Sequence, residues 1–392
     1  MAESVVRFAG SGLNVPPPLS LYIHLPWCVR KCPYCDFNSH AAQTFPENAY
    51  IDALLLDLER ALPDIWGRRI HTVFFGGGTP SLFSAEGVDR ILSGVRTLTQ
   101  LMPGAEITLE ANPGTVEAAK FKGFRDAGVT RVSLGIQSFN PRHLQALGRI
   151  HDDSEARRAA ELAATHFDTF NLDLMFALPG QTLAEALADI ETALDFRPPH
   201  LSAYHLTLEP NTPFGHSAPP QLPDDDLAAD MQQAIAERLV DAGMQHYETS
   251  AYALPGHACR HNLNYWQFGD YLGIGAGAHS KLSFHDRIVR QMRVKHPRQY
   301  MEAVEKGCHI AETRTLTRHD LPFEFMMNAL RLNEGVPAAL FEARTGLPLG
   351  VCAPALEQSR ARGLLEADAD RLQPTLQGQR FLNDVLDRFL PA

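Results

Sequence analysis

The run HLPWCVRKCPYCDF, residues 24–37, holds three cysteines in one short loop, and its spacing decides the fold. Cys28, Cys32 and Cys35 are spaced C-x3-C-x2-C. Three thiolates can bind three irons of a cubane [4Fe–4S] cluster, whereas four would close the cluster for electron transfer. The fourth iron then stays open for a substrate or cofactor, as an open position does in catalytic metal sites. The loop therefore predicts a cluster that takes part in chemistry.

Two other interpretations of this loop stay open from the residues alone. A zinc site would need a fourth ligand, which His24 or His40 could supply. A disulfide with a spare thiol is the second, although the chain has the character of a cytosolic protein. The remaining cysteines, Cys259, Cys308 and Cys352, lie far apart and do not suggest a disulfide framework.

The composition is that of a soluble globular protein, with 45% hydrophobic and 21% charged residues in a chain of 392. Its net charge of −11 gives it no general electrostatic reason to bind nucleic acid. The first residues lack the basic and apolar segments of a signal peptide, and no stretch is long and apolar enough to span a bilayer. We therefore expect a cytoplasmic protein in a reducing compartment, where an oxygen-sensitive cluster survives.

Runs rich in β-forming residues alternate with helical patterns from residue 19 onwards. This alternation predicts an α/β fold with a parallel sheet and helices outside it. Six such units indicate an incomplete (β/α)6 barrel, whose ligands bind at the carboxyl ends of the strands. The expected strands are 19–25, 70–75, 106–110, 129–136, 169–176 and 200–208, and the helices between them are 47–62, 84–101, 115–127, 152–165 and 183–196.

The chain divides into four predicted segments: a leader over 1–18, the partial barrel over 19–210, a barrel-closing region over 211–295, and a C-terminal domain over 296–392. The last segment is expected to hold helices at 297–306, 321–332, 337–345, 351–360 and 377–389, with a short hairpin at 363–374. Three helices and a hairpin resemble a winged-helix fold, an α+β extension of the barrel. Since residues 366–370 are acidic, we expect a structural or protein-contact module rather than one that binds DNA.

Polar residues follow the carboxyl ends of the expected strands. The run GGGTP, residues 76–80, leaves a strand without bulky side chains, so its backbone can approach a ligand closely. Glu110 ends the next strand and could accept hydrogen bonds from hydroxyl or amine groups, or cap the following helix. Along 131–138, Arg, Ser and Gln share one strand face. Asp173 faces the expected interior and needs partners there, for which Arg149 is a candidate.

A second motif, HNLNYW at residues 261–266, precedes a glycine-rich run. A neutral imidazole from His261 can bind haem iron, and Tyr and Trp can stack on a macrocycle. A lone histidine beside aromatic residues is nevertheless more often packed than a ligand. Cys259 is another soft ligand candidate. A basic run follows, which could pair with propionates or form a solvated face. Its members are Lys281, Arg287, Arg290, Arg293, Lys295 and Arg298.

These motifs occur in one order over about residues 19–280 and resemble the radical S-adenosylmethionine (SAM) superfamily. Within it, they resemble the family of oxygen-independent coproporphyrinogen III oxidase, HemN, and its haem-chaperone relative, HemW. The resemblance implies that the open iron chelates the amino and carboxylate groups of SAM. One electron then splits SAM to give a 5′-deoxyadenosyl radical.

Two features favour the chaperone branch of this family. The oxidase has a further cysteine two positions after the third cluster cysteine, where this chain has Phe37, and it has a longer segment before the first strand. The chaperone branch also uses an H-N-x-x-Y-W motif to bind haem. The resemblance thus implies a haem chaperone with a [4Fe–4S] cluster and exchangeable SAM, which needs an electron donor and delivers haem to apo-proteins, some of them at a membrane. The competing hypotheses are a radical decarboxylase acting on coproporphyrinogen III and another radical SAM enzyme such as a methyltransferase.

The resemblance also implies roles for single residues. The three loop cysteines hold the cluster, and His261 is the haem ligand candidate. His205 and His279 lie where the family places further SAM contacts. The positions that match SAM-contacting residues are Tyr22, Tyr34, Gly77, Gly78, Thr79, Glu110, Gln137, Arg149 and Asp173.

Overall fold

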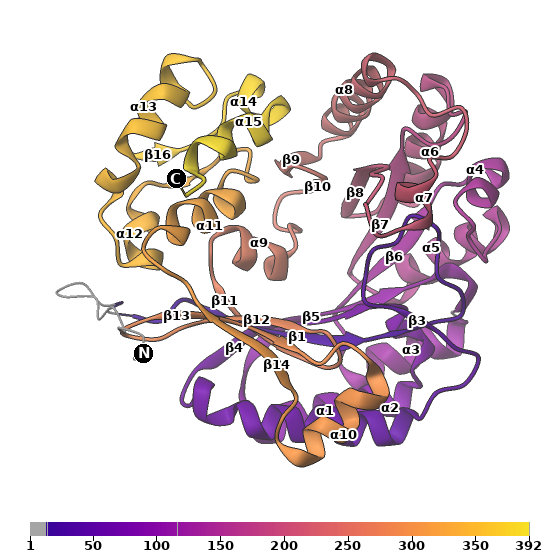
Figure 1. The fold of residues 1–392 in the computed structure, drawn as a ribbon. Coiled ribbons are helices and arrows are strands. Elements are labelled where there is room, and N and C mark those ends of the chain that lie inside the picture. Colours follow the sequence, from indigo (N-terminus) through magenta and orange to yellow (C-terminus); the bar gives the residue numbers. More distant parts are fainter. Residues whose placement is uncertain (1–12, 14, 116, 392) are drawn as a thin grey trace.

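A twelve-stranded sheet forms the centre of the computed structural model, which describes residues 13, 15–115 and 117–391 (Figure 1). The strand order is β14-β13-β12-β11-β1-β4-β5-β6-β7-β8-β10-β9. The predicted incomplete barrel is confirmed, because six neighbouring strands pair in parallel. β11 adds a seventh parallel strand beside β1, and antiparallel strands follow beyond β11 and β8. The six neighbouring strands are β1 Leu19–Leu25, β4 Arg69–Gly77, β5 Gln100–Ala111, β6 Arg131–Gln137, β7 Thr169–Phe176 and β8 His200–His205. Of the predicted leader at 1–18, only residues 13 and 15–18 are among those described.

Helices cross between the parallel strands and cover the outer face of the sheet (Figure 1). The Ser84 side chain accepts a hydrogen bond from the Gly87 N–H at 2.9 Å and so starts α2 where the sequence predicts. Helix α3 ends at Gly128, whose φ of 111° is open to glycine without strain. The bounds are α1 Glu47–Ala61, α2 Ala85–Leu98, α3 Ala118–Ala127, α4 Pro141–Ala146, α5 Asp153–His166, α6 Leu183–Asp195, α7 Pro213–His216 and α8 Asp225–Asp241, with 3-10 turns η1 Leu62–Ile65, η2 Pro80–Leu82 and η3 Pro113–Thr115.

Alternation along the strands separates an apolar face from a polar one. On β1, Leu21 and Ile23 are fully buried in the core that the sheet shares with its helices. Ser20 and Tyr22 point to the other, inner face, and the register brings Ser20 beside Thr72 of β4. Polar side chains of neighbouring strands therefore collect on the inner face, which is where the candidate site lies.

The sheet continues past the barrel on both edges. One edge has β11 Asp270–Ile274, β12 His279–Ser283, β13 Ile288–Arg293 and β14 Ile310–Thr315, and the other has β10 Ala251–Ala253 and β9 Gln245–Glu248. Residues 297–315, which the sequence analysis assigned to the C-terminal domain, lie with this sheet instead. Helix α10 Pro297–Lys306 packs on α1, and β14 pairs with β13. The amphipathic pattern of residues 297–306 shows that one face of this helix is buried, but it does not show whether that face packs on the sheet's helices or on the C-terminal domain.

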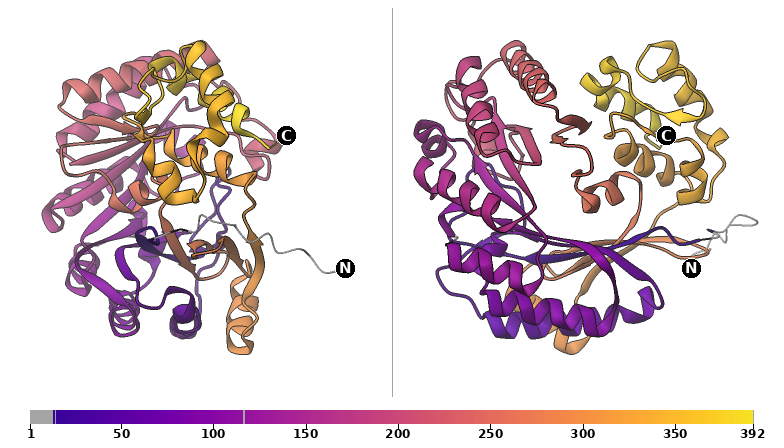
Figure 2. Two further views of the ribbon diagram at one scale, coloured as in Figure 1. Left: turned by 90° about the vertical axis from the view of Figure 1, so that its left-hand side faces the viewer. Right: turned by 180° about the vertical axis from the view of Figure 1, so that it is seen from behind.

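Residues from Leu316 onwards form most of a second apolar core, which also takes in Leu13, Phe268 and Ile288. The C-terminal part of the chain lies on the concave side of the sheet, opposite α1 and α2 (Figure 2). The helix predicted at 377–389 is broken into two short helices and a turn, because Phe381 leaves helical geometry. The elements are α11 Asp320–Ala329, β15 Val336–Pro337, α12 Ala339–Thr345, η4 Leu349–Cys352, α13 Ala353–Ala361, β16 Arg371–Leu372, α14 Leu376–Arg380, α15 Leu382–Leu386 and η5 Asp387–Phe389. Among the described residues, no helix has both the length and the apolar character needed to cross a membrane.

Candidate cofactor site and the buried histidine motif

The cysteine loop packs directly against the glycine turn that follows β4. The Gly78 N–H donates to the Leu25 carbonyl at 2.9 Å, and the Thr79 N–H donates to the Trp27 carbonyl at 2.7 Å. A Cβ on Gly78 would lie 2.5 Å from the Trp27 carbonyl oxygen and 3.0 Å from Cys28 Sγ. Glycine is therefore required here by the close approach of two backbones. The sequence analysis expected close approach to a ligand at this turn, and the structure shows close approach to the cysteine loop. The loop is closed by pairing of β2 Trp27–Cys28 with β3 His40–Ala41.

All three loop cysteines are free thiols, with Cys28 buried and the other two partly exposed. Burial raises the pKa of the Cys28 and Cys35 thiols, and this rise is opposed chiefly by the Thr79 side chain at Cys28 and by the Phe37 backbone at Cys35. Because a metal takes these groups as thiolates, binding would release protons. Among the described residues, no three His, Cys, Asp or Glu side chains are grouped so that they could hold a single metal ion.

Arg149 joins the cysteine loop to the end of β6. Its Nη1 lies 3.8 Å from Cys32 Sγ and 3.5 Å from the Tyr34 hydroxyl, and its Nη2 donates to the Gly135 carbonyl at 2.6 Å. Gln137 has a φ of 68°, a left-handed value that is unusual for a residue with a Cβ. The Gln137 side chain packs over Gly135, since a Cβ added to Gly135 would lie 3.0 Å from Gln137 Nε2. Three of the predicted SAM-contacting positions, Tyr34, Gln137 and Arg149, thus gather at one edge of the loop.

Glu110 ends β5 beside the glycine turn, where its Oε2 accepts from the Gly77 N–H at 3.3 Å. Burial, and then the nearby Asp173 carboxylate, raise the pKa of Glu110 to about 8. Near neutral pH this carboxyl is therefore largely protonated until a cation approaches it. Tyr22 lies on β1, which β4 separates from β5, and its hydroxyl is 3.0 Å from His24 Nδ1.

Asp173 on β7 is held by side chains of its own and the adjacent strand. Its carboxylate accepts from Ser133 Oγ at 2.9 Å and from Asn171 Nδ2 at 2.7 Å. The Asn171 Oδ1 in turn is 2.7 Å from His200 Nδ1, so the contacts continue to β8. Burial raises the pKa of Asp173 despite these bonds. The network fixes the direction of the carboxylate toward the barrel interior.

The sequence analysis missed residues on β8, and its two further histidine candidates, His205 and His279, stay predictions. Ser202 and Tyr204 share the inner face with His200 and lie beside Asp173, and the same two-residue alternation that found Asp173 would have found them. His205 contacts the Phe176 ring at 5.5 Å between centroids, and His279 begins β12. Neither makes a side-chain hydrogen bond to a described residue at the positions matched to SAM.

His261 lies inside the barrel at the amino-terminal half of β4. It belongs to a short helix, α9 Arg260–Trp266, and only 1% of its surface is exposed. Its Nδ1 is 2.8 Å from Thr72 Oγ1, and its Nε2 is 3.0 Å from the Tyr265 hydroxyl. Burial, and then Arg131, lower the pKa of His261 to about 3. The ring is therefore neutral, and both of its nitrogens are engaged.

The partners of this ring fix its tautomer. Thr72 Oγ1 donates to Ser20 Oγ at 2.8 Å, so it accepts from His261 Nδ1. Nδ1 carries the proton, and Nε2 accepts from the Tyr265 hydroxyl. The lone pair that could bind a metal thus points at Tyr265, which is partly exposed, while the rest of the imidazole is covered.

Helix α9 is held between the barrel and the second core. At its start, the Glu106 carboxylate of β5 accepts from the N–H groups of Arg260 and His261 at 3.2 and 3.1 Å. Cys259 Sγ lies 3.7 Å from the same carboxylate, and burial raises its pKa to about 12, so it stays a thiol. On the other side, Trp266 packs against the second core and lies 4.3 Å from the Arg331 guanidinium.

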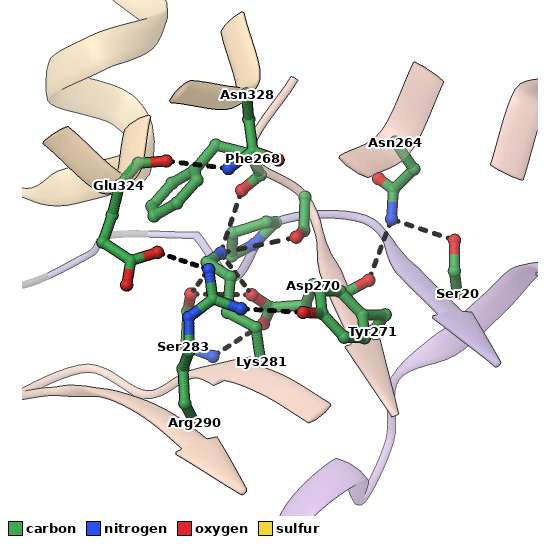
Figure 3. A network of polar contacts seen from close by, with 12 residues as sticks. Ser20, Asn264, Phe268, Asp270, Tyr271, Lys281, Ser283, Arg290, Glu324 and Asn328 are labelled. Carbon is green, nitrogen blue, oxygen red and sulfur yellow. Dashed lines mark hydrogen bonds and ion pairs between the residues drawn. The ribbon is translucent and has the colours of Figure 1, made fainter. Parts of the chain in front are cut away.

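Three members of the basic run, which the sequence analysis expected either to pair with propionates or to form a solvated face, are paired with carboxylates of this chain. Lys281 is fully buried and bonds Asp270 at 3.0 Å (Figure 3). Arg290 pairs with Glu324 and donates to the Tyr271 hydroxyl at 2.7 Å (Figure 3). Arg293, also buried, pairs with an aspartate of α1, Asp57, at 3.2 Å. Glu324 and Asp57 lie 34 and 236 positions from their arginines, so no local pattern predicts these pairs, whereas Asp270 lies 11 positions from Lys281.

Two family models match this chain. The radical SAM superfamily matches residues 22–193, and the HemN C-terminal domain matches residues 316–381. The first spans the cysteine loop and most of the parallel strands, and the second spans most of the second core.

Comparison with curated proteins of nearly the same length identifies the family more narrowly than the two family models do. The heme chaperone HemW of Escherichia coli is 52% identical over 377 residues, 95% of this chain and 98% of the relative. The proteins of the same name from Haemophilus influenzae and Bacillus subtilis are 50% and 34% identical, each over 95% of this chain and 98% and 99% of the relative. This chain belongs to the HemW family. The family predicted from the motifs is thereby confirmed, and its relatives align across the barrel, α9 and the second core.

The fold of the HemW family member described here is also that of a solved oxidase. Coproporphyrinogen III oxidase (HemN) from Escherichia coli, a radical SAM enzyme, superposes with a TM-score of 0.81 over 95% of this chain and 90% of the oxidase. The identity between them is 24%, so this likeness establishes a shared fold and no shared reaction.

Proposed function

We propose that this protein is a haem chaperone, which binds haem and passes it to acceptor apo-proteins. The observation that carries the proposal is its 52% identity, over nearly the full length of both chains, to a protein named heme chaperone HemW. The cysteine loop and the HNLNYW motif support the same function, because they offer the two iron sites that such a protein needs.

We propose that Cys28, Cys32 and Cys35 hold a [4Fe–4S] cluster with one open iron. The donor set fits, since three free thiols lie in one loop against a turn that admits only glycine at Gly78. When bound, the cluster and SAM supply one-electron chemistry. The neighbouring guanidinium of Arg149, 3.8 Å from Cys32 Sγ, places a positive charge where thiolates would stand.

The SAM site that we propose comprises Tyr22, Tyr34, Gly77, Gly78, Thr79, Glu110, Gln137, Arg149 and Asp173. Two carboxyl groups with raised pKa values, Glu110 and Asp173, support the binding of a cation here. An ammonium or sulfonium group beside them would favour their ionised forms and so lower both pKa values. Binding of SAM should therefore release a proton from Glu110 near neutral pH.

We propose His261 as the haem ligand, through Nε2. Because Nε2 accepts from the Tyr265 hydroxyl in the arrangement described above, ligation requires that Tyr265 leave it. One hydrogen bond contributes about 0.5–1.5 kcal/mol, a cost that a bond to iron can offset. Trp266 packs on the second core, so a larger movement of α9 would also involve the C-terminal unit.

The second candidate function is oxidative decarboxylation of coproporphyrinogen III, which the shared fold with the HemN oxidase favours. Phe37 argues against it, because the oxidase branch has a cysteine at this position and here the residue is apolar and 57% exposed.

Anaerobic reconstitution tests both candidates. The chaperone should bind about four irons and four sulfides per chain, develop a Soret band with added haem, and pass that haem to apo-myoglobin. With SAM and a reductant it should not convert coproporphyrinogen III to protoporphyrinogen. Conversion without haem transfer would establish the oxidase instead.

The setting of this function is a further part of the proposal. We propose a cytoplasmic protein, because three free loop thiols and an oxygen-sensitive cluster need a reducing compartment. Its acceptors include apo-proteins at the membrane, and an electron donor reduces the cluster. Fractionation of cells with an antibody to the chain, with and without an acceptor, would test the location.

A further inference from the structure

Arg131 carries a buried charge that no carboxylate among the described residues neutralises. It begins β6, with its side chain on the inner face of the barrel, and it is only 3% exposed. Its guanidinium takes part in none of the ion pairs that the described part of the chain forms. Its Nε is buried and also lacks a hydrogen-bond partner there. A buried charge without a partner is unfavourable, so an arginine held in this way calls for an anion from outside the chain.

Two other buried cations show the arrangement that folding alone produces. Arg293 is 1% exposed and pairs with Asp57 at 3.2 Å, and Lys281 is 1% exposed and bonds Asp270 at 3.0 Å. Each of these charges is neutralised by a carboxylate within the chain, which offsets part of the cost of burial. Arg131 is nearly as deeply buried but lacks such a partner, so packing does not account for its charge.

Two carboxylates whose charge acts on Arg131 are held by other donors. Glu106 on β5 accepts from two backbone N–H groups at the start of α9. Asp173 on β7 accepts from two side chains on β6 and β7. Burial acts to lower the pKa of Arg131, but neighbouring groups, Glu106 and Asp173 among them, raise it above its ordinary value. The guanidinium is therefore charged and lies near two carboxylates without being paired to either.

The register of the sheet places Arg131 in one row with the residue on which His261 packs. Phe74 on β4 is the partner of Thr108 on β5, and Thr108 is the partner of Arg131 on β6. We call these three residues the inner row. The His261 ring lies on Phe74, with ring centroids 5.0 Å apart. Two strand spacings put the backbones of Phe74 and Arg131 about 10 Å apart. The imidazole and the guanidinium thus lie at the same level of the barrel interior, near opposite ends of the row.

The middle residue of the inner row also lacks a polar partner. Thr108 is fully buried, and its Oγ1 bonds no described residue. A hydroxyl and a guanidinium on adjacent strands offer several donors to one acceptor group. A carboxylate suits both, because it accepts from the guanidinium with two oxygens and also neutralises its charge. A neutral acceptor would satisfy the hydrogen bonds and leave the charge of Arg131 unpaired.

We propose that Arg131, with Thr108, binds a haem propionate while His261 ligates the iron. This proposal rests on the haem-binding function proposed above. Propionates are ionised at neutral pH, as the side chains of Asp and Glu are, and they are the negative groups at the edge of the macrocycle. The contact is an ion pair with hydrogen bonds, in which no covalent bond forms or breaks. Three cations of the basic run could take this part only by leaving a carboxylate of the chain, namely Lys281, Arg290 and Arg293.

Helix α9 controls access to the inner row. It lies on the concave side of the sheet (Figure 1) and packs on β4, while Glu106 of β5 holds its first N–H groups. It therefore covers the end of the row at Phe74. The movement of α9 that frees His261 Nε2 also opens the way to Arg131, so that one movement exposes an iron ligand and a carboxylate partner together.

The test combines a change in the protein with a change in the ligand. Arg131→Gln removes the charge of the guanidinium, and haem dimethyl ester lacks the charges of both propionates. Titration of the Soret band, with both ligands in the same mild detergent, gives the ratio of the affinity for haem to that for the ester. In the wild type this ratio should be about ten or more, because hydrogen bonds to charged groups are the strong ones. It should fall to near one in Arg131→Gln and lie between these values in Arg131→Lys, which keeps the charge but not the planar pair of donors.

Arg293→Gln is the matched control, since Arg293 is a buried arginine whose partner, Asp57, belongs to the chain. It should keep the wild-type ratio of affinities. Denaturant unfolding of the haem-free proteins should show a larger loss of stability for Arg293→Gln than for Arg131→Gln, because only Arg293 loses an ion pair. The opposite order, together with a wild-type ratio in Arg131→Gln, would show that Arg131 acts in folding alone and would overturn the proposal.

The outcomes separate this proposal from the proposed function. A wild type that gives no Soret band with haem would overturn the proposed function, whatever the variants do. A wild type that binds haem and its dimethyl ester equally tightly would overturn the propionate site alone. If Arg131→Gln does not fold, Thr108→Val gives the same comparison, since it removes only a buried hydroxyl that bonds no described residue. It should lower the ratio about two- to tenfold, and an unchanged ratio would overturn the site.

Discussion

Tyr265→Phe should strengthen haem binding if His261 is the iron ligand. The substitution removes the hydroxyl that His261 Nε2 accepts from at 3.0 Å. It keeps the aromatic ring, which packs edge-on against Tyr271 with centroids 4.4 Å apart. The Nδ1 bond to Thr72 stays, so the imidazole keeps the tautomer with a free lone pair on Nε2. The variant therefore changes the availability of the ligand and little else.

The expected size follows from that one hydrogen bond. Its loss disfavours the closed arrangement by about 0.5–1.5 kcal/mol. Only molecules in which His261 Nε2 is not hydrogen-bonded can bind the iron, and the substitution increases their fraction. The apparent haem affinity should therefore rise about two- to tenfold. The stability of the haem-free protein should fall by a similar free energy.

Titration of the Soret band measures the affinity, and denaturant unfolding of the haem-free protein measures the stability. Tyr252→Phe is the matched control, because Tyr252 is buried against His246 and its hydroxyl bonds no described residue. His261→Ala alone cannot decide the question, since it empties a buried site and destabilises the protein by about 2–5 kcal/mol. Lower stability of Tyr265→Phe with unchanged haem affinity would refute the ligand role and leave His261 as a packing residue.

Three further predictions concern the cluster and the SAM site. Alanine at any of the three loop cysteines should lower bound iron and sulfide far below about four each, whereas Cys308→Ala, at an exposed cysteine, should not; iron and sulfide analysis checks this. Gly78→Ala should prevent cluster assembly by the same analysis, because its Cβ would lie 2.5 Å from a carbonyl oxygen, while Gly350→Ala meets nothing within 4 Å and should assemble normally. The folded protein raises the pKa of Glu110 from 4.5 to about 8, so the stability that this proton contributes is complete below pH 4.5 and is lost as the pH rises through about 8. Glu110→Gln should therefore flatten the fall of thermal stability over this range, and an unchanged pH profile would count against the shift.

The sequence predicted much of the barrel because its signals are local. Strand 169–176 was predicted with the bounds that β7 has. Helix α6 begins at Leu183 as expected, since Thr182 and Glu185 form a capping box within four residues. Helix α9 was missed, because its seven residues are too few to show a helical period. The strands β12 and β13 were not predicted, and their residues were described only as a basic run. Their charged residues interrupt the apolar alternation that usually indicates a buried hairpin.

The sequence by itself determined the spacing of the three thiols, the order of strands and helices, and the family, because each of these depends on residues a few positions apart. Only the tertiary structure decided what surrounds His261 and which cations are free. Thr72, which holds the imidazole, is 189 positions from it, and Asp57 is 236 positions from Arg293. No local pattern encodes such pairs. A buried charge or ring nitrogen takes whichever partner the folded chain brings within hydrogen-bonding distance, and that partner decides whether the group can reach a ligand.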